Sequence, residues 1–190
     1  MSDGMSGKLS PTLWRTCRVL ANRKRLAILC ELFRNPGLTV TMIASRLNLQ
    51  VPVTSRYTRE LNARGLLQAR RSGKWVRYRP FADKSVQGAV PLLRELAHAF
   101  AVEKQPIELI YRKTTAFTHP RRIAIVIALR SGCHTIPSLR SRTGISRFAL
   151  ARHLKKLEQR GFVWTDTNGC RILKPTNRFA SELLELATQE

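Results

Sequence analysis

The sequence has few acidic residues, since 12 Asp and Glu stand against 34 Lys and Arg and give a formal net charge of +22 over 190 residues. Long apolar runs are also missing. The longest, Ile123–Leu129, is far short of the roughly 20 residues that a membrane-spanning helix needs. The amino terminus is polar and has no secretory signal. We therefore expect no membrane association, a cytoplasmic location and a polyanionic partner, with nucleic acid as the leading class.

Patterns that hold metals or carry out catalysis are absent as well. The four cysteines are dispersed without a CxxC pair, and the four histidines are isolated. Reduced thiols are the expected state, with a zinc or thiol sensor as the alternative. No phosphate-binding loop or nucleophile–base pair is recognisable. The sequence therefore predicts no enzyme, no metal site and no cofactor.

What the sequence does contain is enough apolar material for real cores, at 43% hydrophobic residues. A chain of this length forms one mid-sized domain or two small ones. The positive charge is shared between the halves: residues 1–103 carry 18 cations and 6 anions, and residues 104–190 carry 16 and 6. Neither half is therefore a merely basic tail.

The segment Ser146–Gly161 has the spacing of an amphipathic helix. Three leucines recur at i, i+4 and i+7 and share one face: Leu150, Leu154 and Leu157. Arg152 points the opposite way. The segment Gln50–Gly65, 96 residues earlier, matches it and places Arg56 under Arg152. We interpret the two segments, about 51–64 and 147–160, as a pair of DNA-recognition helices.

The surrounding elements repeat in the same order. For residues 10–103 we expect helices at 11–21, 23–33, 39–47, 51–64 and 85–102, with strands at 66–70 and 75–79. For residues 105–190 we expect helices at 106–117, 120–130, 135–142, 147–160 and 177–188, with strands at 163–166 and 170–174. Three helices followed by a hairpin form a winged helix-turn-helix. We therefore predict a mainly α fold with small β-hairpin wings, built as two tandem repeats.

Three stretches resemble the ArsR-type winged-helix regulators. Leu20–Leu29 looks like their opening helix, Ile145–Leu157 (ISRFALARHLKKL) like their recognition helix, and Gly65–Arg79 like their wing. Members of that family are usually homodimeric transcription factors that dimerise through their first and last helices. The resemblance implies a DNA-binding regulator, and leaves open which effector it senses.

Two departures from the family pattern matter. Two repeats in one chain imply a covalent pseudo-dimer, monomeric rather than an obligate homodimer, with helices 11–21, 85–102, 106–117 and 177–188 in a central bundle. We expect Val86, Val90, Leu93, Ala97 and Phe100 to be the apolar stripe of helix 85–102. The second departure is that neither 41–48 nor 135–142 contains a cysteine. The family's metal-sensing role is therefore not carried over.

The predicted DNA contacts on the recognition helices centre on Arg56 and Arg152, each opposite its apolar seam. Tyr57 and His153 match a position where the family has a contacting histidine, and packing is the alternative for both. Phe148 is expected to meet a thymine methyl group or, alternatively, to pack under the wing. The phosphate candidates are Arg59, Lys155 and Lys156, and Val53, Ser146 and Arg147 complete the helical set.

The wings supply the remaining candidates. The first wing contributes Arg70, Arg71, Lys74 and Arg77, and the second contributes Asn168 and Arg171. Thr54 and Thr58 replace Leu150 and Leu154, so the first recognition helix should have a thinner seam and rely more on its basic wing.

We therefore hypothesise a sequence-specific regulator that binds double-stranded DNA and associates with the nucleoid. Two alternatives stay open at this point. One is a tandem winged-helix protein that organises chromosomes by gripping another protein. The other is a non-specific nucleoid-binding or RNA-binding protein.

Overall fold

The computed structural model of the chain describes residues 12–167 and 169–189. The first repeat contains, in chain order, α1 (Leu13–Leu20), α2 (Arg23–Arg34), β1 (Leu38–Thr39), α3 (Val40–Arg46), α4 (Val51–Asn62), β2 (Leu67–Ser72), β3 (Trp75–Pro80) and α5 (Ala89–Ala101). The second contains α6 (Ile107–Thr114), the 3-10 turn η1 (Thr115–Phe117), α7 (Pro120–Arg130), α8 (Ile136–Thr143), α9 (Arg147–Gln159), β4 (Val163–Asp166), β5 (Gly169–Ile172) and α10 (Arg178–Thr188). The predicted mainly helical fold with small hairpins is confirmed.

Helix starts follow the polar caps that the sequence supplies. The side chains of Asn22, Thr39 and Asn177 each accept a hydrogen bond from a backbone N–H in the first turn of α2, α3 and α10. Thr135 and Ser138 form a reciprocal capping box at the start of α8. These short helices are therefore fixed at their amino ends by local chemistry.

A glycine in the left-handed conformation follows each recognition helix, although α4 ends at Asn62 and α9 at Gln159, before the predicted ends at 64 and 160. Gly65 and Gly161 have φ values of +65° and +74°, a left-handed conformation that other residues rarely adopt. A Cβ atom at Gly65 would lie 2.9 Å from the Cβ of Val86, so space as well as conformation excludes a side chain. The chain can therefore turn sharply from each recognition helix into its wing.

The hairpins differ from the prediction in their registers. Ser72 pairs with Trp75, so the first wing closes on the two residues Gly73 and Lys74. Asp166 pairs with Gly169, so the second strand begins one residue before the predicted 170. A short strand that we did not predict, β1, pairs Leu38 with Tyr78 and attaches the first wing to the helices.

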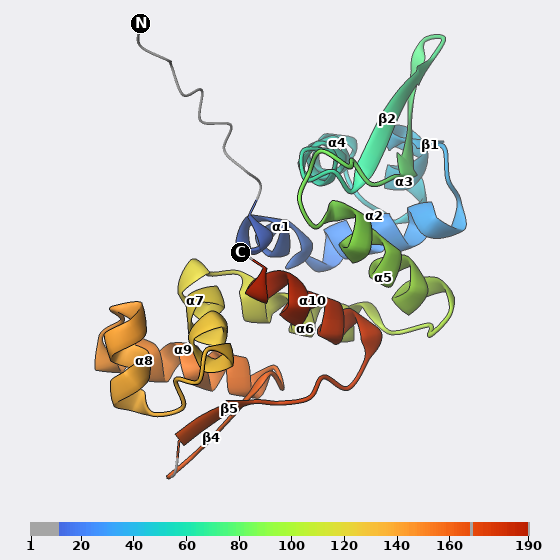
Figure 1. Cartoon of the computed structure of the whole chain (residues 1–190). Coiled ribbons are helices and arrows are strands. Elements are labelled where there is room, and N and C mark those ends of the chain that lie inside the picture. The colour runs from blue at the N-terminus through green and yellow to red at the C-terminus, as the bar shows by residue number, and fades with distance from the viewer. Residues whose placement is uncertain (1–11, 168, 190) are drawn as a thin grey trace, which may run out of the picture.

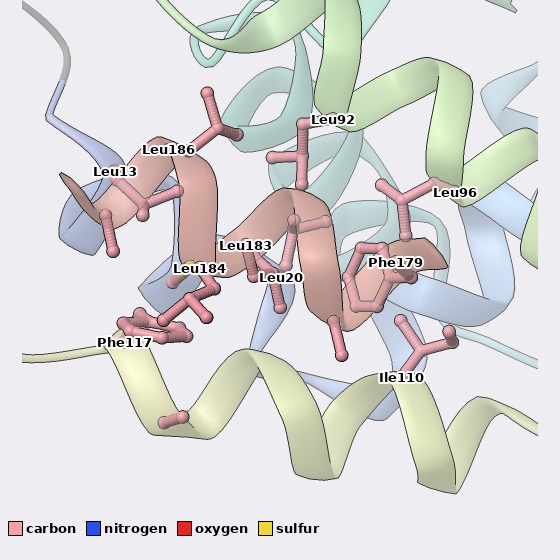
Figure 2. Packing of buried hydrophobic residues seen from close by; sticks show 14 of the residues in the cluster. Leu13, Leu20, Leu92, Leu96, Ile110, Phe117, Phe179, Leu183, Leu184 and Leu186 are labelled. Carbon is pink, nitrogen blue, oxygen red and sulfur yellow. The ribbon is translucent and has the colours of Figure 1, made fainter. Parts of the chain in front are cut away.

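Helices α1, α5, α6 and α10 lie between the two winged parts, and the two hairpins point away from each other at opposite ends of the molecule (Figure 1). Figure 2 shows α10 between α5 and α6, with Phe179 and Leu183 among the side chains that fill the space. Phe179 is 1% exposed and Leu183 is fully buried. One contiguous hydrophobic cluster therefore includes residues of both repeats.

The predicted apolar stripe of the helix at 85–102 is only partly right. The helix begins at Ala89, after Gly88 in the left-handed conformation. Val90 is 44% exposed, whereas Leu92 and Leu96, which the prediction omitted, are buried. The reason is that α5 packs on α2 along one side and on α10 along another, which widens and rotates its buried face.

Ion pairs join the repeats around this core. Glu95 on α5 is buried and accepts hydrogen bonds from Arg178 of α10, at 3.1 Å, and from its neighbour Arg94, at 2.9 Å. Burial opposes ionisation of the Glu95 carboxyl, but the two arginines outweigh it and lower its pKa. On the surface, Arg23 binds both oxygens of Glu108 and lies 3.9 Å from the ring centre of Tyr111. Charge and packing therefore fix the same relative placement of the two repeats.

A shared core predicts that the repeats unfold together. Leu183→Ala should lower the free energy of unfolding of the whole chain by about 2–5 kcal/mol, because it leaves a cavity between α5 and α10. The measurement is urea unfolding followed by circular dichroism and tryptophan fluorescence in parallel. Val102→Ala, at a residue 66% exposed, is the control and should change stability by less than about 0.5 kcal/mol. Two separate transitions in the unmutated chain would contradict a shared core.

Candidate nucleic-acid interface

The second recognition helix, α9, is seated as its spacing predicts. Leu150 and Leu157 are fully buried and Leu154 is 3% exposed. Each buried leucine contributes roughly 1.5–3 kcal/mol relative to an exposed one. On the opposite side, Arg152 is exposed and Phe148 is 90% exposed. An aromatic ring so open to solvent has no packing role within the described residues.

The first recognition helix, α4, is seated by threonines instead of leucines. Thr54 and Thr58 are fully buried, and their hydroxyls donate to the carbonyls of Gln50 and Thr54 within the same helix, both at 3.1 Å. These hydrogen bonds offset the cost of burying the two hydroxyl groups. A threonine side chain nevertheless makes less apolar contact than a leucine side chain. The seam of α4 is therefore thinner than that of α9, as the sequence predicts.

The two central arginines are both exposed, at matching positions of α4 and α9. The Arg56 side chain is 62% exposed, with its Nε atom 3.9 Å from Glu60 and its guanidinium above the ring of Tyr57. Arg152 is likewise on the surface, and no ion pair of Arg152 is found among the described residues. Both guanidinium groups are free to turn toward an external acceptor.

Tyr57 and His153 adopt the packing alternative. Tyr57 is 9% exposed and His153 is 5% exposed. The His153 ring lies against that of His119, with 4.7 Å between the ring centres. Tyr57 follows Arg56 and His153 follows Arg152, so each side chain points about 100° away from its arginine around the helix. Tyr57 therefore faces α2, and His153 faces the start of α7. Direct contact of either side chain with DNA is therefore not available in this structure.

The structure places the other predicted contact residues as follows. Exposed positions are Arg59, Arg70, Arg71, Lys74, Arg77, Ser146, Arg147, Lys155 and Arg171. Val53 and Lys156 are half-buried, and Asn168 lies outside the described residues. The exposed set belongs to the recognition helices and the wings, as predicted.

The first wing concentrates positive charge on an exposed ribbon. Arg70 and Arg77 are direct cross-strand partners, a placement of like charges that destabilises a hairpin unless an anion neutralises it. Arg77 also donates to the carbonyl oxygen of Gly37 at 3.0 Å, which orients its side chain at the base of the wing. Trp75 is 48% exposed near the tip. The sequence prediction missed this tryptophan, although an aromatic residue between cations in a turn could have revealed it.

The second wing is less basic, and a side chain closes its turn. Asp166 accepts a hydrogen bond from the backbone N–H of Gly169 at 2.9 Å and one from Trp164 at 3.3 Å. Arg171 is the cross-strand partner of Trp164. The two wings therefore differ in charge, as the two recognition helices differ in seating.

A pair of supporting arginines that we did not predict, Arg25 and Arg122, lies at matching positions of α2 and α7. Each guanidinium donates to carbonyl oxygens at the end of the preceding helical segment: Arg25 to Val19 and Arg18, and Arg122 to Ala116 and Thr115. Burial lowers the pKa of Arg122. Arg25 also pairs with Glu60 of α4. These contacts attach the central bundle to each winged unit.

Within residues 12–167 and 169–189 no group of three or more His, Cys, Asp or Glu side chains is placed to hold a metal ion. Over the same ranges no helix is long and apolar enough to span a bilayer.

Comparisons with known proteins agree with this geometry. Residues 22–68 match the family described as winged helix-turn-helix DNA-binding, and residues 119–165 match the bacterial regulatory protein, arsR family. No curated protein matches. A crystal structure of human N-acetylserotonin methyltransferase in complex with SAM aligns at 15% identity with a TM-score of 0.33, over 78% of this chain and 39% of that chain. That likeness is too weak to bear on function.

The buried histidine of α9 makes stability depend on pH. Burial, with His119 and nearby arginines, lowers the pKa of His153 from the ordinary 6.5 to about 4. The unfolded chain therefore takes up this proton at higher pH than the folded chain does. The free energy of unfolding should consequently fall as pH drops from about 6.5 toward 4.

His153→Tyr, which copies the residue of the first repeat, should remove this part of the pH dependence. Urea unfolding at several pH values between 7 and 4 measures it. An identical dependence in the variant and the original chain would contradict this assignment.

Proposed function

Since the chain carries two winged helix-turn-helix repeats of ArsR type in tandem, we propose that it is a sequence-specific transcriptional regulator that binds double-stranded DNA with both repeats at once. The observation that carries this proposal is the matched exposure of Arg56 and Arg152, on helices joined through one hydrophobic core. A rigid pair of basic recognition helices suits two adjacent binding sites.

In this proposal α4 and α9 enter successive major grooves, about 10–10.5 bp apart on one face of the duplex. The arginines contact guanine edges or phosphates, and Phe148 contacts a thymine methyl group. The first wing, with Arg70, Arg71 and Lys74, reaches the phosphates or the adjacent minor groove. One chain then does what two subunits do in the homodimeric regulators of this type.

We propose a binding role without catalysis, and we assign no effector. A role in which the chain binds only another protein accounts for fewer of the observations. Such a role does not require two arginines, Arg70 and Arg77, to be cross-strand partners on an exposed hairpin. RNA binding also explains less, because an exposed recognition helix fits the wide major groove of DNA better than the deep, narrow one of RNA.

The target should be an imperfect palindrome, because the residues on the two recognition helices differ. Selection of bound sequences from a random duplex pool should recover two unlike half-sites about one helical turn apart. Recovery of a strictly symmetric motif would contradict simultaneous binding by both repeats. Recovery of no motif would contradict sequence specificity.

Neutralising the central arginines tests their contacts. Arg56→Gln and Arg152→Gln should each weaken binding by about 1–3 kcal/mol. An arginine on a phosphate should also lower the slope of log K against log salt by about one, and an arginine on a base should relax the selected sequence at one position.

Arg34→Gln is the matched control for these variants. It removes the same charge from the exposed end of α2, beside Phe100 and Gln105. If Arg34→Gln weakens DNA binding as much as Arg56→Gln and Arg152→Gln do, the loss of affinity comes from net charge alone. That result would refute the assigned contacts.

A further inference from the structure

A cluster of cationic and histidine side chains lies beside the second recognition helix, and four of its six members were not among the contacts predicted from sequence. It draws on three helices and consists of Arg18 of α1, His119, Arg121 and Arg122 around the start of α7, and Arg152 and His153 of α9. We refer to these six residues as the cation cluster. Arg18 belongs to the first repeat, so the cluster exists only because the two repeats pack together.

His119 packs against His153, with 4.7 Å between the ring centres, and so lies close to Arg152, the neighbour of His153 in the chain. Burial, and then the arginines Arg122, Arg121, Arg152 and Arg18, lower the pKa of the His119 ring. All the charged groups that shift it are cations. Among the described residues, Arg18, Arg121 and Arg152 form no ion pair with a carboxylate. The cluster is therefore a concentration of positive charge without an internal counterion.

In the first repeat, a carboxylate neutralises the arginines at the corresponding position. Glu60 of α4 pairs with Arg25 and lies 3.9 Å from Arg56. At the matching position, 96 residues later, α9 carries Lys156. Burial and the nearby arginines Arg160 and Arg122 lower the pKa of Lys156. The second repeat therefore has an ammonium group where the first repeat has a carboxylate that neutralises its arginines.

The histidines supply hydrogen-bonding capacity that the protein does not use. The Nδ1 atom of His119 accepts a hydrogen bond from the backbone N–H of Arg121 at 3.1 Å, so the proton of the neutral ring is on Nε2. The ring of His153 packs behind it, and its buried Nε2 atom has no hydrogen-bond partner among the described residues. Because the two rings pack together, the exposed Arg152 that precedes His153 and the exposed Arg121 that donates to His119 lie on the same surface of the second repeat.

We propose that the cation cluster binds one backbone phosphate of the DNA that α9 reads, and that the matching place in the first repeat does not. The inference rests on the proposed DNA-binding function. Arg18, Arg121 and Arg152 are exposed and His119 is half-buried, so all four side chains are accessible to a phosphate group from solvent. Arg152 also lies on the outer face of α9 with Phe148, which makes the cluster continuous with the base-reading surface.

This phosphate contact makes the second repeat the stronger anchor on DNA. Charge-assisted hydrogen bonds to a phosphate are about twice as strong as neutral ones. The first repeat has the more basic wing, but Glu60 partly neutralises its Arg25 and Arg56. The half-site of α9 is therefore held close to its recognition helix, and that of α4 mainly through its wing.

The test uses a duplex carrying the selected sequence, in which single phosphates are replaced one at a time by uncharged methylphosphonates. In the original protein, one replacement beside the α9 half-site should weaken binding about tenfold. In Arg121→Gln the same replacement should cost only about three- to fourfold, because one of the groups that hold the phosphate is already lost while the others remain. Arg18→Gln should show the same loss of sensitivity.

Lys24→Gln is the matched control, since Lys24 is exposed in the first repeat at the position that corresponds to Arg121. It should leave the tenfold effect intact. Equal sensitivity to the methylphosphonate in Arg121→Gln and in the original protein would overturn the inference, and so would loss of sensitivity in Lys24→Gln. An original protein that binds no duplex would refute the proposed function itself, which keeps the two failures distinct.

Discussion

The packing of α10 between α5 and α6 is the constraint on which the rest of the structure depends. Phe179 and Leu183 fill that contact, and the buried carboxylate of Glu95, held by Arg178, lies at its edge. An unpaired charge there would be strongly destabilising, so the ion pair makes other arrangements of the helices unfavourable. Because every other element is attached to this bundle, the separation and orientation of α4 and α9 are properties of one core. A flexible linker between two DNA-binding units would not fix the separation and orientation of their helices.

Within that frame the two repeats have diverged in complementary ways. The second has leucines beneath its recognition helix and uncompensated cations beside it. The first has threonines beneath, Glu60 among its arginines, and a wing on which Arg70 and Arg77 are cross-strand partners. A homodimer must present two identical surfaces, whereas a covalent pair is free of that requirement. The divergence suits a target whose two halves differ in sequence.

Local features of the sequence were enough to predict much of this fold. Leucine spacing marked the seam of α9, and the matching segments Gln50–Gly65 and Ser146–Gly161 contain the two recognition helices. The repeat at 96 residues paired Arg56 with Arg152. Features that depend on distant parts of the chain were missed, because no local pattern encodes them. Strand β1 has two residues and no periodicity, and the buried face of α5 depends on α10. Tyr57 is buried against α2, and His153 is buried against the start of α7. The exchange of Glu60 for Lys156 matters only because Arg25 and Arg122 face those positions.

The central claim is that one chain holds two recognition helices on DNA at the same time. Hydroxyl-radical footprinting on a selected duplex, combined with the mass of the complex, tests it most directly. The account predicts one chain per duplex and two protected backbone segments on the same face, centred about 10–10.5 bp apart. A single protected segment per chain, or a footprint that needs a second chain, would contradict it.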